Sequence, residues 1–163
     1  MGKNRNEAQR KDTNGKIRVY QRLALYAAIP GIIDLATIII ALAASRRSFL
    51  LAFGLSRFLF GIFEANGVAF CAIFTSLAIA SIYVLLAYFG VKGKPFAGPI
   101  ELALYACDTG FLIYLLVREL SAGSAAPEMV LSLVAHGLFL ILFALEIVFF
   151  ILATKALKKE KQG

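Results

Sequence analysis

Four apolar stretches, each at least 20 residues long, constrain this chain more than any other feature. They cover approximately residues 23–44, 68–91, 98–117 and 129–154. About 20 mainly apolar residues are needed for a helix to cross a bilayer, where every backbone amide must be paired within its own segment. Of the 163 residues, 60% are hydrophobic and 17% charged, which is unlike a soluble domain. We therefore predict an all-α fold, a four-helix transmembrane bundle spanning residues 23–154.

A fifth stretch, residues 48–66, is apolar but patterned differently. It reads SFLLAFGLSRFLFGIFEAN, and Gly54, Arg57, Gly61 and Glu64 follow one another at steps of three and four. Residues at these steps share one narrow face of a helix. The pattern is typical of an amphipathic helix, here an interfacial or re-entrant one between the first two spans, with Arg57 and Glu64 as interfacial residues.

Positive charge is concentrated on one predicted side of the membrane. With four spans and the N-terminus inside, 13 Lys and Arg lie on the inner side and four on the outer side. The inner set is Lys3, Arg5, Arg10, Lys11, Lys16, Arg18, Arg22, Lys92, Lys94, Lys155, Lys158, Lys159 and Lys161, and the outer set is Arg46, Arg47, Arg57 and Arg118. Cytoplasmic flanks carry such an excess, so the basic segment 1–22 and the basic tail 155–163 are both predicted to be cytoplasmic. A fifth span would remove most of this asymmetry.

The same cations indicate what the two ends of the chain contact. They flank apolar runs, which favours binding to anionic lipid headgroups. The basic tail has no interleaved aromatic residues, so we expect no nucleic acid partner. Cys71 and Cys107 lie inside apolar runs without a Cys-x-x-Cys pair, which is typical of inert thiols rather than of a disulfide or redox site.

Six polar or ionisable residues within the spans form the candidate intramembrane site, because such side chains are costly there and usually have a role. They are Asp34 in the first span, Glu101, Tyr105 and Asp108 in the third, and His136 and Glu146 in the fourth. The three in the third span share one helix face. At about 1.5 Å per residue, Asp34, Asp108 and Glu146 are predicted at similar depth, and His136 about 10 Å further out. Contact between Asp108 and His136 would then require tilted or offset helices.

Two interpretations of these residues stay open. In the first, the carboxyl of Asp108 is protonated or hydrogen-bonded to Tyr, Thr or Ser and locks the helices together. In the second, carboxylates at mid-depth and a histidine relay protons or hold a cation. One histidine with scattered carboxylates is not typical of a metal centre, so we expect no metal and no cofactor.

Other residues within the spans predict how the helices bend and pack. Pro30 and Gly31 are expected to kink the first helix beside Asp34 and to free a carbonyl group. Small residues recur every four positions at Ala72, Ser76 and Ala80, which favours close helix packing within one chain or between chains. The pentapeptide Leu-Ala-Leu-Tyr-Ala occurs at residues 23–27 and again at 102–106. This recurrence suggests either two related helical hairpins or chance in an apolar sequence.

The sequence gives no positive indication of catalysis. Ser124 lies in a small-residue loop, and His136 is about three helical turns into the following span. The chain has neither a glycine-rich phosphate loop nor a His-Glu-x-x-His motif. A single histidine also excludes bis-histidine haem ligation within one chain.

One region resembles a known group of proteins. Tyr105-Ala106-Cys107-Asp108, a loop, and then Ala135-His136-Gly137 are similar to the Tyr-x-x-Asp of helix three and the histidine of helix four in small bacterial four-helix membrane proteins. The resemblance covers residues 95–145 and implies a four-helix fold in the cell inner membrane. It implies no activity, but it directs attention to Asp108 and His136.

These observations lead to three hypotheses in order of preference. The first is a non-enzymatic structural or accessory subunit, whose partner is another membrane protein or a second copy of this chain. The second is a small proton- or cation-coupled transporter subunit that uses Asp34, Asp108 and His136. The third, an intramembrane enzyme, has the least support.

Overall fold

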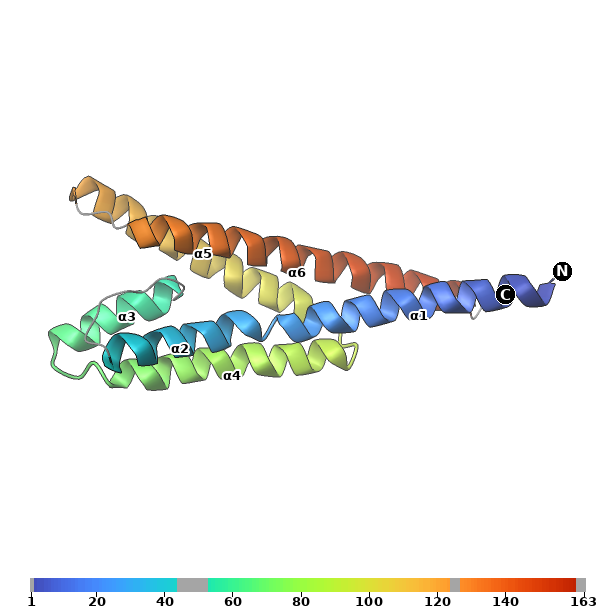
Figure 1. Cartoon of the computed structure of the whole chain (residues 1–163), viewed down its shortest axis with the longest axis horizontal. Helices are drawn as coiled ribbons and strands as arrows, with labels where there is room; N and C mark the ends of the chain where they lie inside the picture. Colours follow the sequence, from blue (N-terminus) through green and yellow to red (C-terminus); the bar gives the residue numbers. More distant parts are fainter. Residues whose placement is uncertain (1, 44–52, 124–126, 161–163) are drawn as a thin grey trace.

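The computed structural model describes residues 2–43, 53–123 and 127–160, and these residues form six helices and no strands. The helices are α1 (Gly2–Tyr26), α2 (Ile29–Ala43), α3 (Gly54–Ala65), α4 (Cys71–Val91), α5 (Ala97–Ser121) and α6 (Pro127–Glu160). Figure 1 shows them along the length of the molecule, with both chain ends at the same end.

Four segments are long and apolar enough to cross a membrane, as the sequence predicts. They are Arg10–Ala43, which joins α1 and α2, Cys71–Val91, Ala97–Ser121 and Pro127–Lys159. The helices extend beyond the predicted apolar stretches, because α1 begins within the basic N-terminal segment and α6 continues into the basic tail. The composition and length of these helices are those of a multi-pass membrane protein.

The first span is broken where proline predicts a kink. The first part, α1, ends at Tyr26, and the second part, α2, begins at Ile29. Pro30 has no N–H to donate, and its ring occupies the space that the carbonyl of residue 26 needs in a regular helix. The backbone of Ala27 and Ala28 instead donates to carbonyls three residues back, at 3.3 and 3.4 Å.

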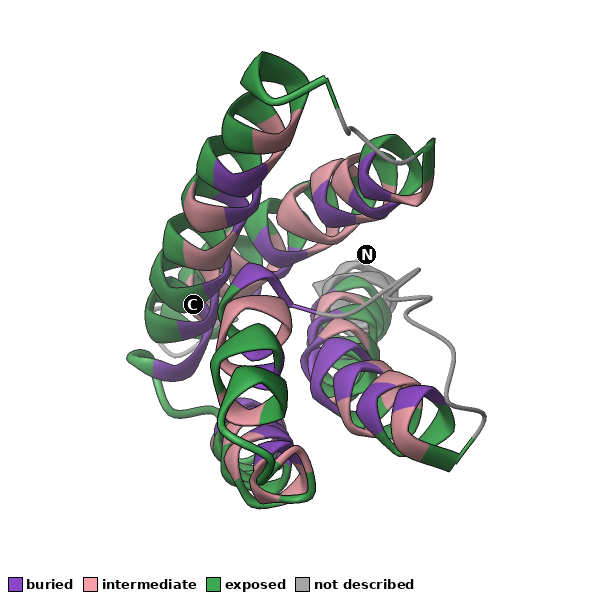
Figure 2. Ribbon diagram, turned by 90° about the vertical axis from the view of Figure 1, so that its left-hand side faces the viewer, coloured by how far each residue is buried: buried purple, intermediate pink, exposed green. Residues whose placement is uncertain are grey.

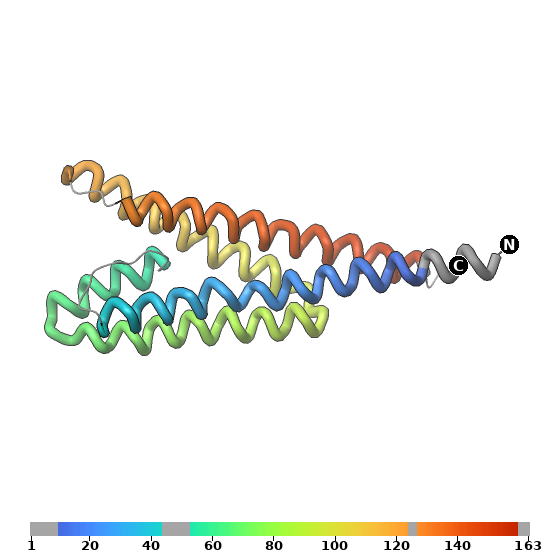
Figure 3. Tube along the Cα trace, in the orientation of Figure 1, coloured from blue at the N-terminus to red at the C-terminus, as the bar shows by residue number. Residues whose placement is uncertain are grey.

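The short helix α3 lies between two pairs of longer helices at one end of the molecule. Extensive contacts join α1 to α6, α2 to α4 and α5 to α6, while α3 contacts both α4 and α5. In Figures 1 and 3, α2 and α4 diverge from α5 and α6 toward one end of the molecule, and α3 fills the space between the two pairs. The N-terminus of α3 therefore lies among the other helices, and its C-terminus lies at the end remote from the chain ends.

The outward faces of the helices are apolar, as expected for surfaces in contact with lipid. Figure 2 shows exposed positions around the outside of the molecule and buried positions facing the other helices. Phe74, Leu138 and Ile40 are 66, 65 and 62% exposed. Polar residues such as Asp34 and Glu146 are instead fully buried, which is the opposite of the pattern in soluble proteins.

The stripe of small residues on α4 packs within the chain. Ala72, Ser76 and Ala80 are all buried. A Cβ atom added at Gly31 of α2 would lie 2.8 Å from the Cα of Ala80, so the backbones of the two helices approach closely. This contact resolves, for this stripe, the choice that the sequence left open between intrachain and interchain packing.

The two copies of the Leu-Ala-Leu-Tyr-Ala sequence have different surroundings. Tyr26 in the first copy is 46% exposed, whereas Tyr105 in the second is 2% exposed. The helix ends immediately after Tyr26 but continues for 16 residues beyond Tyr105, to Ser121. The similarity in sequence is therefore not accompanied by equivalent structure.

Candidate functional site

The N-terminus of α3 lacks a cap of its own. Its N-cap residue is Phe53, whose side chain cannot accept a hydrogen bond. The first backbone amides of any helix have no partner within the helix, and they carry the positive end of the helix dipole. Phe53 is only 3% exposed, so water does not provide a ready substitute and the amides need acceptors from elsewhere in the chain.

Asp34 of α2 supplies one such acceptor. Its Oδ1 accepts the backbone N–H of Phe53 at 2.7 Å, and its Oδ2 accepts the hydroxyl of Ser56 at 2.8 Å. The hydroxyl of Ser76, on α4, lies 3.5 Å from that of Ser56. Since Asp34 is fully buried, these donors replace the hydration that its carboxylate would have in water.

Asp108 of α5 supplies the other acceptors. Its Oδ2 accepts the backbone N–H of Gly54 at 2.9 Å, and its Oδ1 accepts that of Leu55 at 3.0 Å. Carboxylates from two helices that are distant in sequence thus bind three successive amides at the start of α3. This arrangement satisfies orphan donors and places negative charge against the helix dipole.

His136 of α6 completes this group, which we call the α3 anchor (Asp34, Asp108, Ser56 and His136). Its Nε2 lies 3.1 Å from Oδ2 of Asp108, and its Nδ1 lies 2.8 Å from the carbonyl oxygen of Ser132. A carbonyl only accepts, so Nδ1 carries a hydrogen. The contact between Nε2 and the carboxyl then needs one further proton, held either by the imidazole or by Asp108. In both cases the Asp108–His136 pair is electrically neutral overall.

His136 reaches Asp108 through the tilted or offset helices that such a contact was expected to require. The structure places it in direct contact with Asp108, although counting residues put it about 10 Å further out. Measured from the helix ends at Ser121 and Pro127, the two residues differ by only about 6 Å along the helices. The inclination of α5 to α6 in Figure 1 accommodates such a difference.

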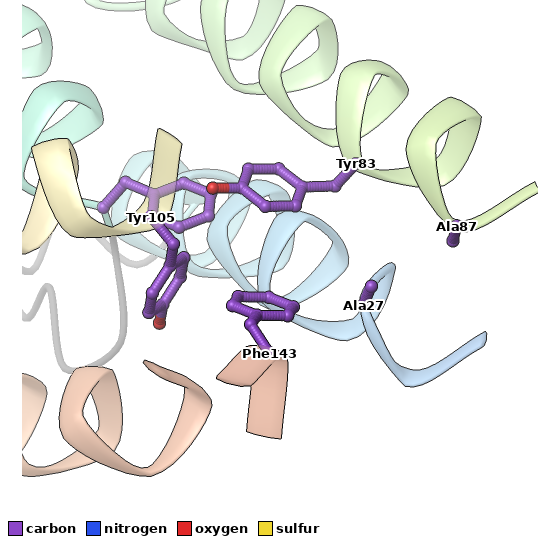
Figure 4. Packing of buried hydrophobic residues seen from close by; sticks show 6 residues of the cluster. Ala27, Tyr83, Ala87, Tyr105 and Phe143 are labelled. Atoms are coloured by element: carbon purple, nitrogen blue, oxygen red, sulfur yellow. The ribbon is translucent and has the colours of Figure 1, made fainter. Parts of the chain in front are cut away.

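Aromatic rings pack against the anchor. The ring of Tyr105 stacks on His136 with centroids 4.9 Å apart, and Phe53 stacks on Tyr83 at 5.3 Å. Figure 4 shows Tyr83, Tyr105 and Phe143 converging from three helices, with Ala27 and Ala87 alongside. The cluster limits access of water to the anchor from this direction, which strengthens its electrostatic interactions.

Glu101 and Glu146 form a separate pair. Both are fully buried and lie within electrostatic reach of one another. Glu146 was predicted at the depth of Asp34 and Asp108, but it lies beside Gly98, which is ten residues before Asp108 on α5. That prediction is wrong. Counting residues from one membrane face ignores that the helices are tilted differently and extend by different lengths beyond the apolar stretches.

The predicted interfacial residues Arg57 and Glu64 line an open cleft of about 600 Å³ between α3 and the end of α5. Arg57 forms an ion pair with Glu119 of α5, with an N–O distance of 3.6 Å. Gly54 belongs to the same predicted face, yet it is packed against α5 at the anchor. The face therefore changes from a buried contact at its start to an open polar cleft toward its end.

Two residues at this site were not singled out from the sequence: Ser56, a member of the anchor, and Phe53, whose backbone amide Asp34 accepts. Their part in it depends on contacts between helices that no local pattern encodes. Within the described residues there is no group of three or more His, Cys, Asp or Glu side chains that could hold a metal ion. No protein-family model, curated protein or solved structure matches this chain.

Proposed function

We propose that this protein is a non-enzymatic structural or accessory subunit of a membrane assembly. The observation that carries the proposal is the use of its two central aspartates. Four hydrogen bonds join Asp34 and Asp108 to the first residues of α3. Side chains so engaged stabilise a fold, and they leave few acceptor sites for a substrate.

We further propose that α3 is a re-entrant half-helix. Its 12 residues extend about 18 Å, which is too short for the hydrocarbon core of about 30 Å but sufficient for half of it. Asp34 lies about 11 residues, or roughly 16 Å, inside the first apolar stretch. The N-terminus of α3 is therefore near mid-membrane, where irregular backbone is tolerated only if protein groups satisfy it.

The orientation follows from charge. The basic N-terminal half of α1 and the basic end of α6 lie at one end of the molecule (Figure 1). We propose that this end is cytoplasmic, at the inner membrane of a cell, with its cations against anionic headgroups. Tyr20 and Phe150 pack together there, with ring centroids 5.2 Å apart, and this contact holds the two basic ends side by side.

A proton-coupled transporter subunit is the second candidate. It is favoured by the proton that the Asp108–His136 contact requires. Asp108 also lines a cavity of about 180 Å³ between α4 and α5, whose other walls are mainly apolar side chains. A proton held between two side chains beside a cavity favours a relay, but this cavity offers little that would bind a polar substrate.

Purification under native conditions separates the two candidates. The full chain would be isolated from its own cell membranes in mild detergent, and its complexes analysed by mass spectrometry. We expect a membrane protein or a second copy of the chain in a fixed stoichiometry. Recovery of the chain alone, together with an H⁺ flux in proteoliposomes that Asp108→Asn abolishes without unfolding, would contradict the subunit proposal and support transport.

A further inference from the structure

Glu101 and Glu146 are the two most unusually placed charges outside the α3 anchor. Both side chains are fully buried. None of their four carboxyl oxygens meets a hydrogen-bond donor among the described residues. A buried carboxylate normally has several donors, because the loss of its hydration is otherwise uncompensated. The carboxyl groups of this pair therefore lack the hydrogen-bond donors that a buried carboxylate needs.

The surroundings of Glu146 are shaped to leave room for its carboxyl group. Gly90 of α4 and Gly98 of α5 lie against it, and a Cβ atom added at either would come within 3.2 or 3.5 Å of its Oε1. Ala24 of α1 closes the same space, 2.8 Å from a Cβ atom at Gly90. Two glycines from α4 and α5 thus leave room for this carboxyl, and Ala24 of α1 packs beside one of them.

A small cavity lies beside Glu146, on the side of the molecule where both chain ends lie. Its volume is about 20 Å³, and its lining includes Tyr20, Lys94, Pro95, Gly98 and Glu146. That volume is enough for a single water molecule. Lys94 is exposed in the turn between α4 and α5, so it marks the aqueous mouth of the cavity.

The groups around the pair do not neutralise it. Tyr20 from α1 and Tyr83 from α4 lie within electrostatic reach of Glu101. Among the described residues that line the cavity beside Glu146, Lys94 is the only cation. Two negative charges in a dry site repel one another, so such a pair requires a bound cation or proton.

The geometry favours a proton over a metal ion. Calcium requires six to eight oxygen ligands, and magnesium a nearly ideal octahedron. Two carboxyl groups and a space for one water molecule do not provide either shell. A shared proton needs no further ligand, because the protonated oxygen of one glutamate donates to an oxygen of the other.

We propose that Glu101 and Glu146 form a proton-binding site that exchanges with the cytoplasmic side through this cavity. On binding, one carboxylate oxygen forms an O–H bond and the charge of the pair changes from −2 to −1. On release, the same bond breaks and the proton leaves through the water-sized cavity. The site is separate from the α3 anchor and does not depend on the proposed subunit role, whereas the assignment of its open side to the cytoplasm rests on the proposed orientation.

Infrared difference spectroscopy of the full chain in lipid bilayers tests this site. We expect a protonated-carboxyl band at pH 7 that shifts in D₂O and declines as the pH rises. The double variant Glu101→Gln/Glu146→Gln should lose one carboxyl equivalent of this band. Glu128→Gln, at the start of α6, is the matched control and should keep it, while Asp108→Asn identifies any contribution from the anchor.

Retention of the full band in a folded double variant would overturn the proposal, as would absence of the band from the wild-type protein. If the double variant does not fold, ¹³C-glutamate carboxyl resonances of the wild-type protein in bilayers decide the matter. The proposal requires one strongly coupled pair that titrates apart from the remaining glutamates. Uniform titration of all glutamates would overturn it.

Discussion

Asp108→Asn is expected to destabilise the protein by about 3 kcal/mol, whereas Asp34→Asn should cost about 1 kcal/mol or less. The two substitutions are chemically identical and affect the same helix terminus. The difference arises from the donors that each carboxylate meets. Both variants would be compared with wild type by reversible unfolding in detergent micelles.

The loss of stability at Asp108 arises because both of its partners are backbone N–H groups, which can donate a hydrogen bond but cannot accept one. Its two oxygens accept the backbone amides of Gly54 and Leu55. Whichever oxygen becomes the NH₂ of asparagine will face a backbone N–H, which cannot accept. One backbone amide at the start of α3 then loses its acceptor, and a hydrogen bond to the carboxyl group is lost.

One partner of Asp34 is a hydroxyl group, which can change from donor to acceptor. Its Oδ1 accepts the backbone amide of Phe53, which an asparagine oxygen can still do. Its Oδ2 accepts the hydroxyl of Ser56, and a hydroxyl can rotate to accept from an NH₂ group instead. Equal destabilisation by the two variants, or a larger effect at Asp34, would contradict this description of the anchor.

Gly54→Ala is expected to destabilise the protein by about 1–3 kcal/mol. A Cβ atom at this position would lie 2.8 Å from the backbone nitrogen of Leu112 and 3.0 Å from its Cα. Backbone atoms cannot turn aside as a flexible side chain can, so α3 would have to move away from α5. That movement lengthens the hydrogen bond from Gly54 to Asp108.

Gly61→Ala is the matched control on the same helix. An added Cβ atom there has no atom within 4 Å, and alanine favours helix by up to about 1 kcal/mol over glycine. We expect unchanged or slightly increased stability in the same unfolding assay. If Gly54→Ala behaved like Gly61→Ala, the close contact between α3 and α5 would not be a determinant of the fold.

The spans and the kink at Pro30 could be predicted because they depend on local properties of the chain. Length and hydropathy identify a membrane helix, and proline disrupts a helix wherever it occurs within one. The inward position of Glu101 and Tyr105 on one face of α5 also follows from helical periodicity, and both are buried.

The grouping of the polar residues could not be predicted in the same way. Counting from one membrane face placed Glu146 with the aspartates and His136 apart from them, because it assumed parallel helices with equal ends. Asp34 and Asp108 bind the same helix terminus only because α3 lies between α2 and α5, which depends on tertiary contacts. The role of Gly90 and Gly98 beside Glu146 depends likewise on packing between three helices.

Labelling of single cysteines with a membrane-impermeant thiol reagent tests the position of α3 within the membrane most directly. Cys71 and Cys107 would first be replaced by alanine, and cysteine then introduced singly at Gly15, Leu55, Ala65 or Lys159. We predict labelling of positions 15 and 159 from one side, of 65 from the other, and of 55 only after solubilisation. Labelling of position 55 in intact membranes, or of 15 and 159 from opposite sides, would contradict a re-entrant α3.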